Sequence, residues 1–150
     1  RGDRGRGGRD RFEMMTQLEK GIFLQGTDFF HDAPSETLNA IGVIAREIGV
    51  VAGEAIFAEN DPADAFYALI AGRVRYLRGG EEIRIREAGE LFGLWSVFDG
   101  ELRLVTAVAV EEARLLKVAY DDFQDLILES MDLGQGIYRV LAAEIDELVA

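Results

Sequence analysis

The sequence contains no cysteine and a single histidine among its 150 residues. Without cysteine the chain cannot form a disulfide, a thiolate nucleophile, a zinc–thiolate cluster or an iron–sulfur site. His31 lies between Phe30 and Asp32, just ahead of an expected helix, which favours a surface or capping role. A haem or zinc site needs more ligands than one histidine provides. The sequence therefore predicts no metal site, and the lack of cysteine suits a cytoplasmic location.

Long apolar runs are absent as well. No run approaches the roughly 18 residues that a membrane helix needs, and the arginine-rich N-terminus has no apolar segment behind it. We therefore expect neither membrane insertion nor a signal peptide. No segment resembles a Walker loop, a nucleophile elbow or a zinc-binding helix. We expect no catalytic residues, and the chain is interpreted as a non-enzyme.

Acidic residues outnumber basic residues, which gives the chain a formal net charge of -12, and the basic residues are unevenly distributed. Residues 1–11 hold five arginines and two aspartates, which leaves 11 basic against 26 acidic residues in the remainder. So acidic a surface repels phosphate backbones, and we expect no nucleic-acid binding by the domain. The glycine- and arginine-rich opening predicts a disordered tail or linker over residues 1–13, followed by one domain over residues 14–150.

Segments with helical periodicity precede and follow a central region of short strands. A helical pair is expected before the first strand, the second helix having Pro34 at its first position and the spacing Leu38, Ile41, Ala45 on its buried face. From about residue 47 to 118, β-branched runs separated by glycine, asparagine and aspartate predict an antiparallel all-β unit. Glycines 53, 72 and 89 are expected at sharp turns between strands.

The clearest hairpin is predicted over residues 73–86, with a tight turn at Gly79-Gly80. Apolar and charged residues alternate along this hairpin, which predicts an inner face and a solvent face. The inner face is expected to hold Val74, Tyr76, Ile83 and Ile85, and the solvent face Arg73, Arg75, Glu82 and Arg84.

After residue 118 the helical period returns and predicts two C-terminal helices. Asp121 and Asp122 suit the start of the first helix. Its apolar stripe is Phe123, Leu126 and Ile127, and that of the second is Ile137, Leu141, Ile145 and Leu148. The second stripe is compatible with docking on the domain's own core or with homodimer formation.

Five phrases in a fixed order resemble the cyclic nucleotide-binding domain family. They are LEKGIFL at 18–24, VAGEAIFAENDPADAFY at 51–67, IAGRV at 70–74, AGELFG at 88–93 and FGLWSVFDGELRLVT at 92–106. The resemblance implies a mainly β fold, an antiparallel β-roll of the double-stranded jelly-roll type, with N-terminal helices and two C-terminal helices. Turn glycines alone would fit an unrelated antiparallel barrel equally well.

Residues 92–106 resemble the family's phosphate-binding cassette, a strand end, a short helix and a returning strand. The resemblance implies a ligand-binding set of Phe92, Gly93, Leu94, Trp95, Ser96, Arg103, Leu104 and Val105. Gly93 and the following helical turn are suited to point backbone N–H groups at an anion, and Arg103 to add a charge-assisted contact to a cyclic phosphate. The alternative for Arg103 is a surface arginine paired with Glu101.

Two cassette positions depart from the family pattern. Leu94 stands where the family commonly has a glutamate that accepts the ribose 2′-hydroxyl, and Leu104 stands where small or hydroxylated residues are usual. We therefore expect a regulatory domain with altered or lost cAMP and cGMP binding. The alternatives are a functional cyclic-nucleotide module that uses backbone amides and Arg103, and a ligand-free dimerisation or interaction domain. The expected partner is a small anionic effector such as a cyclic nucleotide, and no other cofactor is predicted.

Overall fold

The structure is a computed structural model that describes residues 15–94, 96 and 102–129. Two helices precede the strands and one follows them, in the order expected from the sequence. In chain order the elements are α2 (Gln17–Gln25), α3 (Ser35–Ile44), β1 (Arg46–Val50), β2 (Ala55–Phe57), β3 (Ala65–Ala71), β4 (Val74–Arg78), β5 (Glu81–Arg86), β6 (Leu91–Phe92), β7 (Thr106–Ala109), β8 (Ala113–Ala119) and α5 (Tyr120–Glu129). No helix in this described part of the chain is long and apolar enough to cross a membrane.

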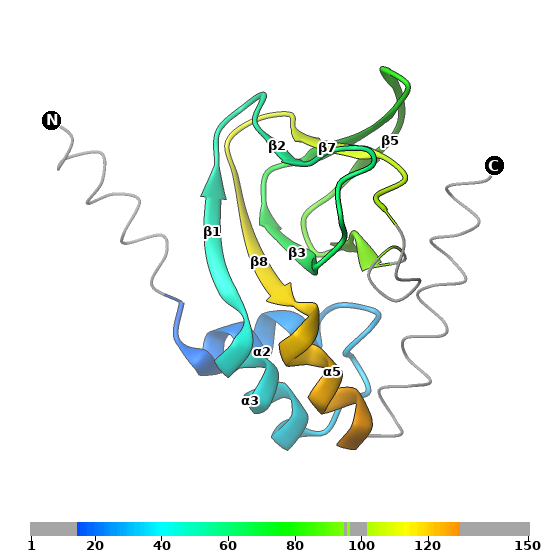
Figure 1. The fold of residues 1–150 in the computed structure, drawn as a ribbon. Coiled ribbons are helices and arrows are strands. Elements are labelled where there is room, and N and C mark those ends of the chain that lie inside the picture. Colours follow the sequence, from blue (N-terminus) through cyan, green and yellow to red (C-terminus); the bar gives the residue numbers. More distant parts are fainter. Residues whose placement is uncertain (1–14, 95, 97–101, 130–150) are drawn as a thin grey trace, which may run out of the picture.

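The strands form two antiparallel sheets of four strands each, stacked as a roll (Figure 1). The first sheet has the order β1-β8-β3-β6 and the second has the order β2-β7-β4-β5. Most neighbours in the sheets come from distant parts of the chain, as in β1 with β8 and β3 with β8, and β4 with β5 is a hairpin. The expected mainly antiparallel β-roll is confirmed.

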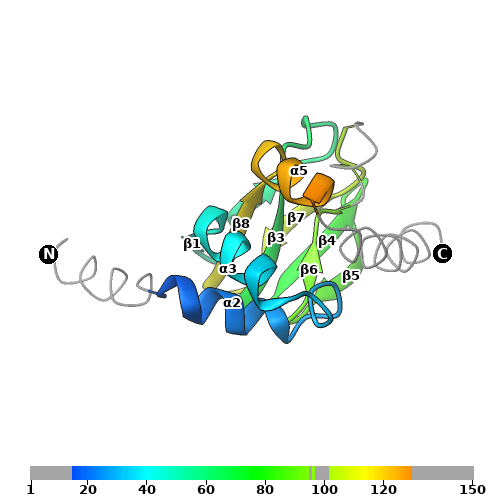
Figure 2. The same ribbon diagram turned by 90° about the horizontal axis from the view of Figure 1, so that it is seen from below.

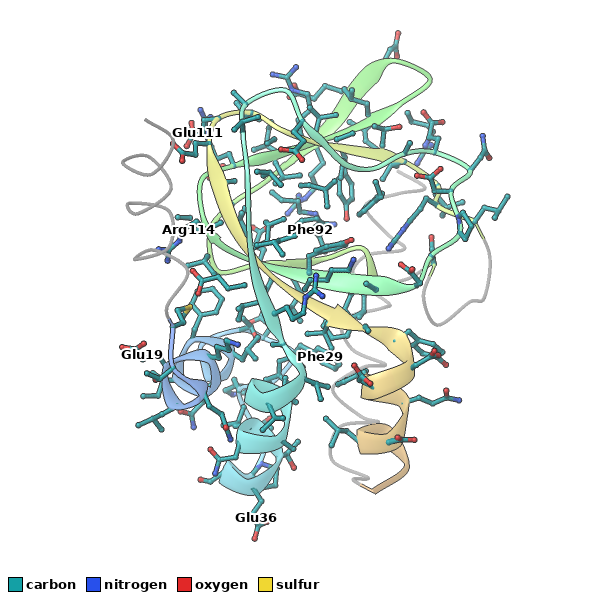
Figure 3. All side chains as sticks on the ribbon, turned by 60° about the vertical axis from the view of Figure 1, so that its left-hand side comes forward. Glu19, Phe29, Glu36, Phe92, Glu111 and Arg114 are labelled. Carbon is teal, nitrogen blue, oxygen red and sulfur yellow. The ribbon has the colours of Figure 1, made fainter. Side chains whose placement is uncertain are left out.

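The described helices α2, α3 and α5 gather at one end of the roll (Figures 1 and 2). Strand β3 alternates between two apolar clusters, because successive side chains of a strand point to opposite faces. Phe66 and Ala68 belong to a cluster shared with the helices, and Tyr67 and Leu69 belong to a cluster shared with the second sheet. Figure 3 places Phe29 at the level of the helices and Phe92 within the roll.

The two N-terminal helices begin differently: α2 has a side-chain cap and α3 has none. Thr16 caps α2 with a capping box: its hydroxyl accepts a hydrogen bond from the Glu19 N–H, and the Glu19 carboxylate accepts one from the Thr16 N–H. The expectation that Pro34 is the first helical residue of α3 is wrong by one position: its ψ of 156° is extended, so Pro34 is the N-cap and the helix begins at Ser35. Leu38, Ile41 and Ala45 are buried as expected.

The turn glycines are also confirmed, since glycines 53, 72 and 89 all have a positive φ. The requirement is strictest at Gly72, where φ is +93° and an added Cβ would lie 2.7 Å from the carbonyl oxygen of Glu112. The roll therefore closes tightly only with glycine here.

The expected faces of the β4–β5 hairpin are wrong in part. The Gly79-Gly80 turn forms with positive φ at both residues, and Arg78 pairs with Glu81 and Leu77 with Glu82. An extra residue, Ile83, then shifts the register, so that Tyr76 faces Arg84 and Val74 faces Arg86. Val74 and Tyr76 are buried as expected, but the residues beside them on the inner face are arginines. Ile83 is 38% exposed and Ile85 pairs with Arg75 on the other face.

The chain after β8 turns directly into α5, with Asp121 and Asp122 in its first turn and Phe123 fully buried, as predicted. The expected second C-terminal helix, with its stripe from Ile137 to Leu148, lies outside the described residues, as do the predicted tail and Trp95. His31 is a surface residue, 3.3 Å from the carboxylate of Asp32.

Candidate functional site

The candidate cassette begins at the edge of the first sheet. Phe92 ends β6, pairs with Tyr67 of β3 and stacks on its ring at a centroid distance of 5.4 Å. Gly93 follows with a φ of +78°, and Leu94 starts the helical segment. A Cβ at position 93 would lie 3.0 Å from an arginine nitrogen and 3.2 Å from the Phe57 ring. Glycine is therefore required both for the turn and for the close approach of Arg103.

The side chain of Arg103 is buried and held by several contacts. It points into the protein, and the residue is 3% exposed, so the alternative of a surface arginine is wrong. Its Nη1 donates to the carbonyl oxygen of Gly93 at 2.8 Å and its Nη2 to that of Ala65 at 2.5 Å. Its guanidinium carbon lies 4.0 Å from the centre of the Phe57 ring. The guanidinium thus links β3, β2 and the cassette turn.

The backbone around Arg103 is held just as firmly. Its N–H donates to the carbonyl oxygen of Asp61, and its own carbonyl oxygen accepts from the N–H of Asn60. A bridge between Pro62 and Leu102 continues this pairing. From Leu102 to Val105 the side chains alternate between exposed and buried, which places Leu102 and Leu104 outward and Arg103 and Val105 inward. The returning part of the cassette is therefore a short extended segment with one inward cation.

The predicted site residues separate into two groups. Phe92 and Val105 belong to the apolar cluster inside the roll, whereas Leu94 is fully buried in the cluster with Leu24 and Phe29, between the helices and the first sheet. Gly93 lies between these two environments. The other predicted residues are Ser96, which is buried, Leu104, which is 44% exposed, and Trp95, which lies outside the described residues.

The N–H of Gly93 is already engaged, because it donates to the hydroxyl oxygen of Tyr76 at 3.0 Å. This bond connects the cassette turn to the β4–β5 hairpin of the other sheet. The Gly93 carbonyl accepts from Arg103, so both backbone polar groups of this residue are used. An anion at the cassette would have to meet backbone N–H groups other than that of Gly93.

Arg103 also affects a neighbouring phenol. Tyr67 is 5% exposed, and burial raises the pKa of its hydroxyl above the usual value of 10. The positive charge of Arg103 opposes this rise in the pKa, and the negative charge of Asp64 adds to it. Desolvation dominates, so the phenol stays neutral at physiological pH.

Sequence reasoning missed a second cationic position inside the roll. Arg86 is 5% exposed, and its guanidinium lies 4.8 Å from the centre of the Tyr76 ring. The carboxylate of Glu90 lies 3.6 Å from Arg86 and 3.9 Å from Arg84. The sequence of β5 alternates isoleucine and arginine, so either set of side chains could face inward. Only the bulge at Ile83 determines that the arginines do.

Comparisons with known proteins agree with this geometry. Residues 48–130 match the family described as cyclic nucleotide-binding domain. The cyclic AMP receptor protein of Thermus thermophilus is 32% identical over 130 residues, which cover 83% of this chain and 60% of that protein. The chain thus spans about 60% of the length of this relative.

Solved structures give the same result. The catabolite activator protein of Thermus thermophilus aligns with a TM-score of 0.72 at 29% identity, covering 81% of this chain and 59% of that one. The sensor domain of the transcriptional regulator DNR from Pseudomonas aeruginosa aligns with a TM-score of 0.76 over 89% of this chain and 93% of its own, and at 21% identity it supports the fold alone. Fold, cassette order and sequence match together place this chain in the cyclic nucleotide-binding domain family.

Proposed function

We propose that this domain is the effector-sensing part of a regulatory protein, with an anion site at residues 92–106 and a weakened affinity for cAMP and cGMP. The observation that carries the anion site is the placement of Arg103. Its buried guanidinium sits at the cassette turn, fixed by two carbonyl oxygens and an aromatic ring. A positive charge held in this way is preorganised for a phosphate or carboxylate.

The weakened affinity rests on the two leucines of the cassette. Leu94 offers no acceptor for a ribose hydroxyl, and its side chain is fully buried among apolar residues. A hydrogen bond to a charged group contributes roughly 1.5–3 kcal/mol, which is about a tenfold to hundredfold change in affinity. At position 104 a leucine stands where the family usually has a small or hydroxylated residue, and its side chain points outward at 44% exposure. The two effects act in the same direction.

Calorimetry with cAMP and cGMP on the complete 150-residue chain tests this proposal. We expect dissociation constants well above the low micromolar range for both nucleotides. Leu104→Ala should strengthen binding, because it restores the small residue that the family usually has next to the arginine. Leu102→Ala is the matched control, since Leu102 is similarly exposed on the other side of Arg103. A low micromolar or tighter constant for either nucleotide on the unmodified chain would overturn the weakened affinity.

A second candidate is a ligand-free interaction domain that keeps the cassette for packing. The same contacts of Arg103 favour it, because they tie two strands and the cassette turn together without any ligand. Amide chemical shifts distinguish the two candidates. Millimolar inorganic phosphate should shift the amides of the cassette if it holds an anion site and should leave them unchanged if the cassette only packs.

We further propose that the domain does not bind duplex DNA and that any self-association uses the stripe Ile137, Leu141, Ile145 and Leu148. The excess of acidic residues after position 11 opposes contacts to phosphates. A gel shift at physiological salt that survives deletion of residues 1–11 would contradict the first proposal. Sedimentation of a Leu141→Glu, Ile145→Glu variant tests the second: it should be monomeric where the native chain is a dimer.

A further inference from the structure

The hydroxyl of Tyr76 occupies the backbone N–H that follows β6 at the cassette turn. It accepts a hydrogen bond from the Gly93 N–H at 3.0 Å, in a buried part of the protein. Tyr76 belongs to β4 of the second sheet, whereas Gly93 follows β6 of the first sheet. The side chain therefore crosses the interior of the roll to fill a hydrogen-bonding position of the candidate site.

Packing on several sides holds this hydroxyl in place. Tyr76 is 2% exposed, and its ring centre lies 6.2 Å from that of Phe92 and 6.4 Å from that of Phe57, both in edge-to-face arrangements. The guanidinium carbon of Arg86 lies 4.8 Å from the same ring centre. In a close-packed interior, such a ring turns only if its neighbours move. The phenol oxygen is therefore a preorganised acceptor for Gly93.

The Gly93 N–H needs an acceptor because it is buried. A buried donor without a partner destabilises a protein by more than an ordinary hydrogen bond stabilises it, because the donor has lost its water. Tyr76 supplies the acceptor from within the chain. An effector atom that reaches this N–H must displace the phenol oxygen, so that binding exchanges one hydrogen bond for another. Only the difference between the two bonds favours the effector.

The chemistry of the displacing atom decides this exchange. A ribose hydroxyl is neutral, as is the phenol, so that exchanging one for the other gains little. An oxygen of a phosphate or carboxylate is charged, and its hydrogen bonds are roughly twice as strong as those between neutral groups. Arg103, whose Nη1 donates to the carbonyl oxygen of Gly93, attracts an anion to this turn and gives a neutral hydroxyl no such advantage. An anionic oxygen is therefore the group that displaces Tyr76.

We propose that Tyr76 is an internal competitor for the effector: its hydroxyl holds the Gly93 N–H, and an anionic oxygen of the effector displaces it. This inference rests on the proposed function, because it assigns a further residue to the same anion site. Tyr76 lowers the affinity for every effector that uses Gly93, and it selects against ligands that offer only hydroxyl groups there. It is a specificity-determining residue that acts through the cassette turn.

Calorimetry with cAMP compares the complete chain with its Tyr76→Phe variant. The variant keeps the ring but removes the hydroxyl, which leaves the Gly93 N–H without its acceptor. We expect the variant to melt at a lower temperature and yet to bind cAMP at least about fivefold more tightly, because the bound anion satisfies the orphaned N–H. A purely structural role of Tyr76 would lower the stability without raising the affinity.

The matched control is Tyr120→Phe, which makes the same chemical change in a partly buried tyrosine that packs against the cluster at the helices. It should leave the affinity for cAMP unchanged. If Tyr76→Phe binds cAMP no more tightly than the unmodified chain, the inference is overturned. Shifts of the cassette amides in the same titration would then still uphold the proposed function.

A second measurement needs no variant and keeps the inference testable if Tyr76→Phe does not fold. Millimolar cAMP should shift the Gly93 amide and the Tyr76 ring resonances of the unmodified chain together, whereas adenosine, which lacks the phosphate, should shift neither. Shifts of other cassette amides with Gly93 and Tyr76 unchanged, or equal shifts by adenosine, would overturn the inference alone. If neither cAMP nor inorganic phosphate shifts a cassette amide in any folded chain, the inference and the proposed function are both overturned.

Discussion

Replacing Arg103 by methionine should destabilise the fold strongly, although the residue lies in a candidate binding site. The substitution keeps an apolar stem but removes the donors to the carbonyl oxygens of Gly93 and Ala65, both of which are buried. An orphaned buried acceptor costs about 1–3 kcal/mol, and the lost contact with the Phe57 ring adds about 0.5–2 kcal/mol. Relief of the buried charge offsets part of this loss. We expect a net loss of about 3–5 kcal/mol in the free energy of unfolding.

Urea unfolding followed by circular dichroism measures this loss, and the melting temperature should fall by roughly 6–20 °C for a chain of this size. Arg103→Lys should lose about half as much free energy, because one ammonium group reaches only one of the two carbonyls while keeping the charge. The control is Arg75→Met, whose exposed ion pair with Glu82 is worth about 0–1 kcal/mol. An Arg103→Met variant as stable as the control would refute the structural role of this guanidinium.

Three further predictions concern the residues around the cassette and the turns. Tyr76→Phe should cost about 1–3 kcal/mol in chemical denaturation, because the buried Gly93 N–H loses its acceptor; an unchanged midpoint would show that this bond contributes nothing. Gly72→Ala should cost more than the roughly 1–2 kcal/mol expected for Gly53→Ala, because both have positive φ but only the first brings a Cβ against a backbone carbonyl, and equal losses would contradict the close approach. The raised pKa of Tyr67 means that its neutral form is favoured by folding, so its contribution to stability is fully present below pH 10 and is lost as the pH rises through the folded-state pKa. Phenolate absorbance against pH, compared with Tyr67→Phe, measures this directly, and a Tyr67 that titrates at or below pH 10 would be the contrary result.

Most of the fold follows from local signals in the sequence. The helix pair, the turn glycines and the first C-terminal helix could all be predicted, because periodicity and positive φ are local properties. The hairpin turn at Gly79-Gly80 was predicted correctly for the same reason.

The faces of the hairpin could not be predicted. The segment from Ile83 to Arg86 alternates isoleucine and arginine, so both registers are consistent with the sequence. The choice depends on the partner strand and on the bulge, which are not local.

The resemblance to the family located the candidate site, but the sequence did not predict the environment of each site residue. Arg103 could be read as a surface residue or as a ligand, and the structure buries it against two carbonyls that lie 10 and 38 positions away along the chain. Leu94 belongs to the cluster between the helices and the first sheet, because the turn at Gly93 redirects the chain. Such long-range contacts leave no periodic signal in the sequence.

The bulge at Ile83 has a consequence for how this domain can diversify. The four residues from Ile83 to Arg86 carry two complete interior surfaces, one apolar and one cationic, and a shift of a single residue selects between them. An insertion or deletion within the hairpin can therefore change the character of the interior without any substitution. Relatives that differ by one residue in this hairpin should therefore bury different side chains in the interior even where the aligned residues are identical.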